Sequence, residues 1–152
     1  MQKVSIVTVI LNIVKNGGEG FFKQAFESVH NQTYLNIEHI IIDGGSKDGT
    51  VELIQSLIPT AKKEIKFVSE PDSGIYNAMN KGINLATGDY IHFLNDTDYY
   101  EDIDVISEVM KVSVENQSDF IIGDVILLYL DGNVTYRSNK NINVSTTFLD
   151  WV

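Results

Sequence analysis

The chain has 152 residues, of which 43% are hydrophobic and 21% charged, a composition typical of one soluble globular domain. Its formal net charge of −10 disfavours binding to nucleic acid or to an anionic membrane surface, because both carry the same sign of charge. The absence of cysteine excludes disulfides, zinc–thiolate sites and thiol catalysis, and it fits a cytoplasmic protein.

Apolar runs alternate with amphipathic stretches along the chain. A continuous β-branched run predicts a strand buried on both faces, whereas apolar residues three and four apart predict a helix. In chain order the first predicted elements are a strand at 4–11, a helix at about 20–31, a strand at 37–42, a helix that Asp48-Gly49-Thr50 opens and Pro59 stops, and a strand at 65–68. The next helix bears Ile75, Met79, Ile83, Leu85 and Ala86 on one face and ends at Thr87-Gly88; it is followed by a strand at 90–94 and by a helix that carries Val105, Ile106, Val109 and Val112. The last predicted strands are at 120–123, 125–130 and 134–137, and a turn at 131–133 joins the last two.

This order predicts a three-layer α/β/α sandwich with a Rossmann-like, mostly parallel sheet. Nothing in the sequence marks a second domain, so we expect a single domain over residues 1–152. The last stretch, 138–152, is polar and contains no finishing element. We therefore expect the chain to end before its fold does.

Two carboxylates, Asp96 and Asp98, follow the predicted strand at 90–94 with Thr97 between them. Hard oxygen ligands of this kind suit Mn²⁺ or Mg²⁺, ions that often bridge protein carboxylates to substrate phosphates. The alternative is a solvated acidic loop that caps the next helix. Spacing alone does not decide between these two interpretations.

Three polar residues lie at the ends of the first two predicted strands. Thr8 and Asn12 have groups that could hydrogen-bond a nucleobase or simply satisfy a loop. Asp43 precedes Gly44-Gly45, where a carboxylate could accept a hydrogen bond from a base or ribose, or could form the turn.

The segment 72–74 predicts a turn that opens a helix, where backbone N–H groups favour an anion. Asp72 begins this turn, and Lys81 on the helix could meet a phosphate or remain solvated. His39 and His92 lie within apolar strands and are predicted to be structural. The chain has no G-x-G-x-x-G after its first strand, no P-loop and no G-x-S-x-G turn, which leaves dinucleotide-binding, P-loop and serine-hydrolase functions unsupported.

Five stretches together, at 4–12, 28–34, 41–50, 70–82 and 86–95, resemble the inverting GT-A glycosyltransferases of the family 2 type that make bacterial surface polysaccharides. The resemblance covers roughly residues 1–100, in order and at the family's spacing. It implies a fold that binds a nucleoside-diphosphate sugar, with a UDP-sugar favoured, and a divalent cation, Mn²⁺ or Mg²⁺. The sugar would pass, with inversion, to a glycan or a lipid-linked acceptor.

Carried over by position, the resemblance implies that Thr8 and Asn12 line the nucleoside site, that Asp43 meets the base, and that Asp72 lies near the nucleotide. It implies Asp98 as the main metal ligand. Relatives usually have a second acidic residue immediately before that aspartate; here Thr97 stands there, and Asp96 restores a D-x-D spacing.

The resemblance divides the domain into a nucleotide-binding core at 1–100 and the start of the acceptor side at 101–152. It implies that the catalytic general base lies beyond Val152, so no catalytic residue is assigned. A homo-oligomer and peripheral association with the inner face of the cell membrane are left open. The alternatives to a transferase are a non-catalytic nucleotide-binding or assembly module with the same fold and, with less support, a nucleotidyltransferase.

Overall fold

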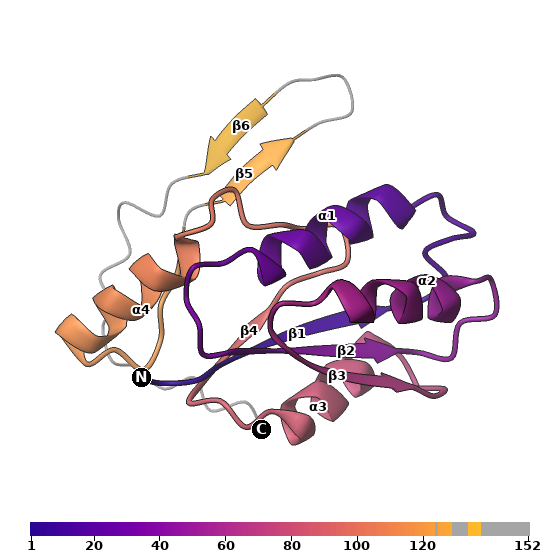
Figure 1. The fold of residues 1–152 in the computed structure, drawn as a ribbon, viewed down its shortest axis with the longest axis horizontal. Coiled ribbons are helices and arrows are strands. Elements are labelled where there is room, and N and C mark those ends of the chain that lie inside the picture. Colours follow the sequence, from indigo (N-terminus) through magenta and orange to yellow (C-terminus); the bar gives the residue numbers. More distant parts are fainter. Residues whose placement is uncertain (124, 129–133, 138–152) are drawn as a thin grey trace. The chain divides into compact units, whose positions relative to one another are not determined.

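A computed structural model of the chain describes residues 1–123, 125–128 and 134–137 (Figure 1). It contains two compact units, Met1–Glu108 and Val109–Val152, and the boundary between them falls within helix α4 (Val105–Asn116). None of the helices in the described ranges has the length and hydrophobicity needed to cross a bilayer.

The first unit is built on a four-stranded sheet in which all neighbouring strands are parallel. Its strands, in the spatial order β3-β2-β1-β4, are β1 (Val4–Ile10), β2 (Ile37–Asp43), β3 (Glu64–Ser69) and β4 (Tyr90–Phe93). The connecting helices are α1 (Glu19–His30), α2 (Thr50–Leu57) with the 3₁₀ turn η1 (Ile58–Thr60), and α3 (Ile75–Leu85). The predicted α/β fold with a parallel sheet is confirmed, and its elements up to β4 have nearly the predicted limits.

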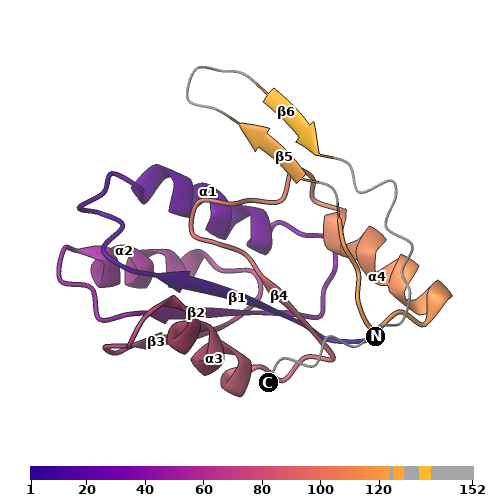
Figure 2. The ribbon, with the colours of Figure 1, turned by 180° about the vertical axis from the view of Figure 1, so that it is seen from behind.

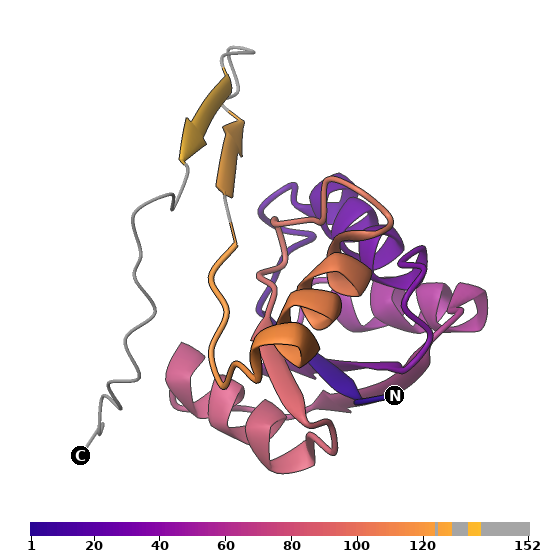
Figure 3. The ribbon, with the colours of Figure 1, turned by 90° about the vertical axis from the view of Figure 1, so that its left-hand side faces the viewer.

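Helices cover both faces of the sheet, as Figures 1 and 3 show. On the face covered by α1 and α2, the core consists of Ile10, Ile13, Phe22, Phe26, Ile41 and Ile54. On the opposite face, which is nearer the viewer in Figure 2, Ala78 of α3 packs against Val7, Ile40 and Ile42. Burial on both sides explains why Val and Ile make up five of the seven residues of β1 and four of the seven of β2.

The sheet buries the predicted apolar face of α3 only in part. Leu85 and Ala86 pack against the core on this side of the sheet, but Ile75 and Ile83 are 54% and 43% exposed. The fully buried residues of the helix are Ala78 and Gly82. The reason is close approach: a Cβ placed on Gly82 would lie 2.3 Å from Val7 Cγ1. Because α3 lies this near to β1, only small residues fit at Ala78 and Gly82, and the periodicity of large apolar residues does not reveal these two positions.

In the second unit, β5 (Val125–Leu128) and β6 (Val134–Arg137) pair antiparallel, with Val125 opposite Arg137. This pairing confirms the predicted hairpin strands; the last two residues of the predicted strand at 125–130 lie outside the described residues. The predicted strand at 120–123 is wrong, because the structure has no strand at these residues. The predicted turn at 131–133 and the expectation about 138–152 lie outside the described residues.

Candidate functional site

The strand order changes direction at β1. The chain proceeds from β1 outward to β2 and β3, then returns to place β4 on the other side of β1. In open α/β sheets, ligands bind beyond the carboxyl ends of the strands at such a switch point. Asp43 ends β2, Asn12 follows β1, and Asp96 and Asp98 follow β4, so these predicted site residues lie along one edge of the sheet.

Asp43 is fully buried, and both of its carboxylate oxygens accept hydrogen bonds from neighbouring loops. Oδ2 accepts from the backbone N–H of Gly45 (3.1 Å) and of Ser46 (3.0 Å) and from Ser69 Oγ (2.7 Å). Oδ1 accepts from Ser46 Oγ. Asp43 therefore forms the turn after β2 and ties that turn to the end of β3; contact with a base stays a prediction.

Asn12 adopts a left-handed backbone conformation, with φ of 49°, one that asparagine tolerates better than most residues. Its backbone N–H donates to Ser46 Oγ (2.8 Å), and its Oδ1 accepts from the N–H of Lys47 (3.1 Å). An acceptor must face that N–H, so the orientation of the carboxamide is determined and Nδ2 is left to donate to a ligand.

Thr8 lies inside the sheet rather than at its edge. Its side chain is 1% exposed, and Oγ1 lies 3.0 Å from His39 Nε2. His39 is itself buried, with Nδ1 3.3 Å from His30 Nε2, which confirms its predicted structural role. A nucleoside contact for Thr8 stays a prediction, and its hydroxyl already has a partner within the core.

Asp72 begins the turn before α3, where its Oδ1 accepts from the N–H of Gly74 (2.9 Å). Its other oxygen lies against the loop after β2: a Cβ on Gly44 would be 2.7 Å from Asp72 Oδ2. A glycine at position 44 therefore permits the Asp72 carboxylate to approach the turn formed by Asp43. The loops after β2 and β3 meet at this contact.

Lys81 is paired rather than solvated. Its Nζ lies 3.0 Å from Glu70 Oε1 and donates to the carbonyl of Pro71 at 3.0 Å. The ammonium group thus fastens α3 to the loop that carries Asp72. A phosphate contact for Lys81 stays a prediction and would compete with Glu70.

Asp96 and Asp98 lie in a tight turn after β4. The N–H of Asp98 donates to the carbonyl of Asn95 (3.1 Å), and Asn95 Nδ2 donates to Asp98 Oδ2 (2.7 Å). Asp96 is half-buried; burial is the main reason that its pKa is raised above the ordinary value, and the nearby charge of Asp98 raises it further. A bound cation would relieve both effects, so this pair of hard oxygen donors fits a divalent ion.

At this turn the protein offers a cation two carboxylates, those of Asp96 and Asp98. Among the residues that the structure describes, no group of three or more acidic or histidine side chains gathers closely enough to hold a metal ion. A cation here would take its other ligands from water and from a substrate, as Mg²⁺ and Mn²⁺ commonly do.

Sequence reasoning missed the residues that connect the loops at this edge. Asp48 is predicted only to open a helix, and its Oδ1 does accept from the N–H of Thr50 (3.1 Å). Its Oδ2 also accepts from the N–H of Lys15 (2.7 Å) in the loop after β1. Burial opposes ionisation of Asp48, but these donors outweigh it and lower the pKa. Asp48 and Lys15 lie more than thirty positions apart in sequence, and only the pairing of β1 with β2 reveals such a contact.

The fold and this edge define an α/β protein of the GT-A glycosyltransferase class. The chain belongs to glycosyl transferase family 2, whose family model matches residues 5–150. It is 31% identical over 124 residues to a PGL/p-HBAD biosynthesis glycosyltransferase of Mycobacterium bovis, a match that covers 81% of this chain and 46% of the relative. It is 32% identical to an uncharacterized glycosyltransferase of Haemophilus influenzae over 88% of this chain and 51% of that one. The chain thus spans about half the length of these relatives.

Solved structures share the fold. The crystal structure of S. aureus TarS in complex with UDP-GlcNAc superposes with a TM-score of 0.65 at 18% identity, over 83% of this chain and 33% of that one. The mannosyltransferase PcManGT from Pyrobaculum calidifontis, in complex with GDP-Man and Mn²⁺, gives a TM-score of 0.67 at 18% identity, over 81% and 34%. At this identity the likeness concerns the fold alone.

Proposed function

We propose that this chain is the donor-binding part of a glycosyltransferase that moves a sugar from a nucleoside diphosphate to a glycan or lipid-linked acceptor. The observation that carries the proposal is the carboxyl edge of the sheet at the switch point. There the loops that bear Asn12, Asp43 and Asp72 are joined to one another, and the Asp96–Asp98 turn follows the strand on the other side of β1. Membership of family 2 supports it.

Within this proposal the donor is a nucleoside-diphosphate sugar, with a UDP-sugar favoured. TarS was solved with UDP-GlcNAc and PcManGT with GDP-Man and Mn²⁺, which supports a nucleotide-sugar and a divalent cation here. Asn12 Nδ2 bonds to no other atom in the described part of the chain and would donate to an acceptor atom on the nucleoside. With one arginine in the whole sequence, charge on the diphosphate would be met chiefly by the cation.

The reaction proposed is a single displacement with inversion. An acceptor hydroxyl oxygen attacks the anomeric carbon, the bond from that carbon to the β-phosphate oxygen breaks, and the hydroxyl proton passes to a general base that is not assigned among the described residues. Asp98 and Asp96 would hold a divalent cation at the end of β4, and that ion would supply charge stabilisation to the leaving diphosphate.

A non-catalytic nucleotide-binding module is the second candidate. Thr97 occupies the position where relatives usually have a further acidic residue, and the described residues offer two carboxylates at this turn rather than three. Such a module would bind the nucleotide without turning it over.

Calorimetric titration of UDP in the presence of Mn²⁺ tests the proposal. Asp98→Asn should weaken UDP binding by about 10- to 100-fold, because the cation loses its ionised ligand. Glu101→Gln, a nearby exposed carboxylate, removes the same charge outside the turn and should leave affinity unchanged. Equal UDP affinity with Mn²⁺ and with a chelator would contradict metal-assisted binding. Binding without transfer or hydrolysis of a UDP-sugar would favour the module.

A further inference from the structure

Four consecutive backbone amides in the loop after β1 donate to side chains of the segment 46–50, which comprises the end of the loop after β2 and the first residue of α2. All of these contacts are between residues more than thirty positions apart in sequence. The pairs are Asn12 N to Ser46 Oγ (2.8 Å), Ile13 N to Thr50 Oγ1 (3.0 Å), Val14 N to Thr50 Oγ1 (3.4 Å) and Lys15 N to Asp48 Oδ2 (2.7 Å). We call the three acceptor residues, Ser46, Asp48 and Thr50, the loop clamp.

The two hydroxyl groups of the loop clamp each donate to a carboxylate and accept from the backbone of the loop after β1. Thr50 is buried with no exposed surface; its hydroxyl donates to Asp48 Oδ1 (2.6 Å), so both lone pairs are free to accept from the amides of residues 13 and 14. Ser46 behaves in the same way, since its hydroxyl donates to the buried Asp43 and accepts from Asn12. Each clamp hydroxyl is thus oriented by a carboxylate.

The loop clamp fixes the position and backbone conformation of Asn12. Asn12 has φ of 49°, a conformation that must be held by its surroundings. On one side its N–H is bound by Ser46, and on the other its Oδ1 accepts from the N–H of Lys47. The next three amides of the same loop are bound by Thr50 and Asp48. The side-chain Nδ2 of Asn12 is therefore presented from a loop whose backbone is held at four successive residues.

We infer that Ser46, Asp48 and Thr50 are positioning residues for the donor nucleotide: they do not contact it, but they hold Asn12 in the arrangement that does. This inference rests on the proposed function, because it requires Asn12 to meet the nucleoside. A preorganised donor group loses little freedom on binding, and so the clamp increases nucleotide affinity rather than contributing a contact of its own.

The test compares Thr50→Val, which keeps the side-chain shape but removes the hydroxyl, with Thr50→Ser, which retains the hydroxyl. Amide hydrogen exchange measured by NMR reports on the loop, and calorimetry with UDP and Mn²⁺ reports on the site. Thr50→Val should accelerate exchange at the amides of Ile13 and Val14 and weaken UDP binding about tenfold. Thr50→Ser should restore both. Ile54→Val, a buried change in the same helix, controls for loss of stability and should alter neither.

Asp48→Ala provides a second variant if Thr50→Val does not fold, since Asp48 lies nearer the surface; it should accelerate exchange at Lys15 and weaken UDP binding. The inference is overturned if exchange at these amides does not change, or if it accelerates while UDP affinity stays at the wild-type value. Failure of the wild-type chain to bind UDP is a different result: it overturns the proposed function, and this inference with it.

Discussion

Nδ1 of His39 lies 3.3 Å from Nε2 of His30, inside the face of the sheet that α1 covers. The N–H groups of Lys62 (3.3 Å) and Lys63 (3.1 Å) point at His30 Nδ1, which must therefore accept. His30 then carries its proton on Nε2 and donates to His39, and His39 in turn donates from Nε2 to Thr8 Oγ1 (3.0 Å). The backbone thus selects the neutral tautomer of both rings.

This chain of hydrogen bonds predicts that stability falls in mild acid. Burial is the main cause that lowers the pKa of His30 from 6.5 to about 4 and that of His39 to about 3. Because the unfolded chain binds these protons near pH 6.5, the free energy of unfolding should decrease below that pH, by up to about 1.4 kcal/mol per pH unit for each histidine, and level off below the folded-state pKa values. Urea denaturation between pH 7 and pH 4.5 measures this decrease in the free energy of unfolding.

The matched variants are His39→Gln and His92→Gln. His39→Gln should reduce the pH dependence in this window, whatever it does to stability at pH 7. His92 lies on β4, with Nδ1 2.7 Å from the hydroxyl of Tyr100. Burial lowers the pKa of His92, but the charge of Asp98 opposes this, so the net shift is smaller than for His30 and His39 and its replacement should change the slope less. A slope unaffected by His39→Gln would show that other groups take up the protons.

Glu38 is a buried charge whose removal has a predictable effect on stability. It has no exposed surface, and its carboxylate accepts from Ser5 Oγ (2.6 Å), the N–H of Thr87 (2.6 Å) and the Nζ atoms of Lys3 and Lys66 (2.8 Å each). Burial alone would raise the pKa of Glu38, but these donors outweigh it and hold the pKa well below its ordinary value. Glu38→Ala should lower the free energy of unfolding by about 3 kcal/mol, since it leaves several donors without their acceptor.

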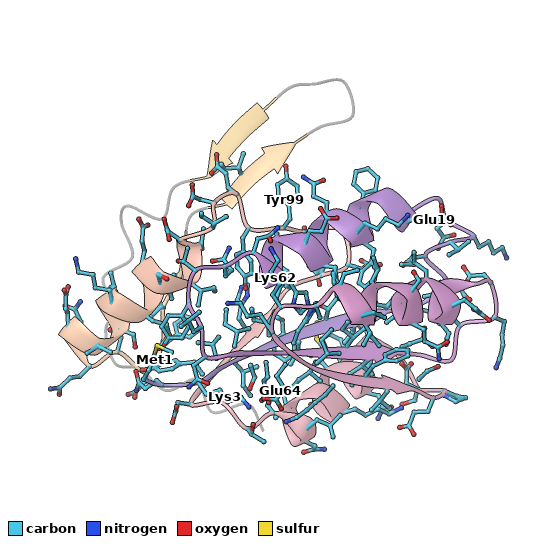
Figure 4. All side chains as sticks on the ribbon, viewed as in Figure 1. Met1, Lys3, Glu19, Lys62, Glu64 and Tyr99 are labelled. Carbon is cyan, nitrogen blue, oxygen red and sulfur yellow. The ribbon has the colours of Figure 1, made fainter. Side chains whose placement is uncertain are left out.

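Glu64 provides the control for this prediction. Figure 4 shows it near Lys3, to which it is bonded at 2.8 Å, but its side chain is 52% exposed. An exposed ion pair contributes about 0–1 kcal/mol, so Glu64→Ala should have a small effect. Equal losses from both variants in urea denaturation at pH 7 would mean that Glu38 is not the centre of this cluster.

The position of the candidate site could be predicted from the sequence, but the hydrogen-bond partners of its side chains could not. Runs of Val and Ile identify β1 and β2, and parallel strands bring their carboxyl ends to one edge, which is where Asp43 and Asn12 lie. Whether a carboxylate is free depends on distant partners. Ser69, 26 positions from Asp43, supplies one of the hydrogen bonds that occupy it.

The distance between α3 and the sheet also could not be predicted from the sequence. The spacing of large apolar residues on α3 predicts a buried face of which Ile75 and Ile83 are exposed, because proximity to β1 places the small residues Ala78 and Gly82 innermost. The run at 120–123 has strand-like residues but belongs to no described strand, because the residue types alone do not determine where a strand forms.

Because Gly44 and Asp72 are in contact, we expect that adding one methyl group at position 44 lowers the affinity for the nucleotide. In Gly44→Ala the new Cβ would lie 2.7 Å from Asp72 Oδ2, which must move the carboxylate away from the loop after β2. If Asp72 lies near the nucleotide, UDP binding should weaken about tenfold, or about 1.4 kcal/mol. Ser73→Ala, at an exposed neighbouring position, should have no effect in the same calorimetric titration. Unchanged affinity in Gly44→Ala would remove Asp72 from the proposed site.

Replacement of glycine by alanine should have opposite effects on stability at Gly82 in α3 and at Gly20 in α1. In Gly82→Ala the Cβ would lie 2.3 Å from Val7 Cγ1, and the resulting displacement of α3 from β1 should cost about 1–3 kcal/mol, more than the gain in helix propensity. A Cβ placed on Gly20 in α1 would meet no described atom within 4 Å beyond its own stretch of helix. Gly20→Ala should therefore stabilise the protein by about 0.5 kcal/mol.

A double-mutant cycle separates steric overlap from other causes. Val7→Ala removes the methyl group that Gly82→Ala would overlap, so the double variant should be more stable than the sum of the single effects predicts. Thermal and urea denaturation of the four proteins measures this coupling. Strictly additive losses would mean that α3 does not rest on Val7, and that the small residues on its inner face have another origin.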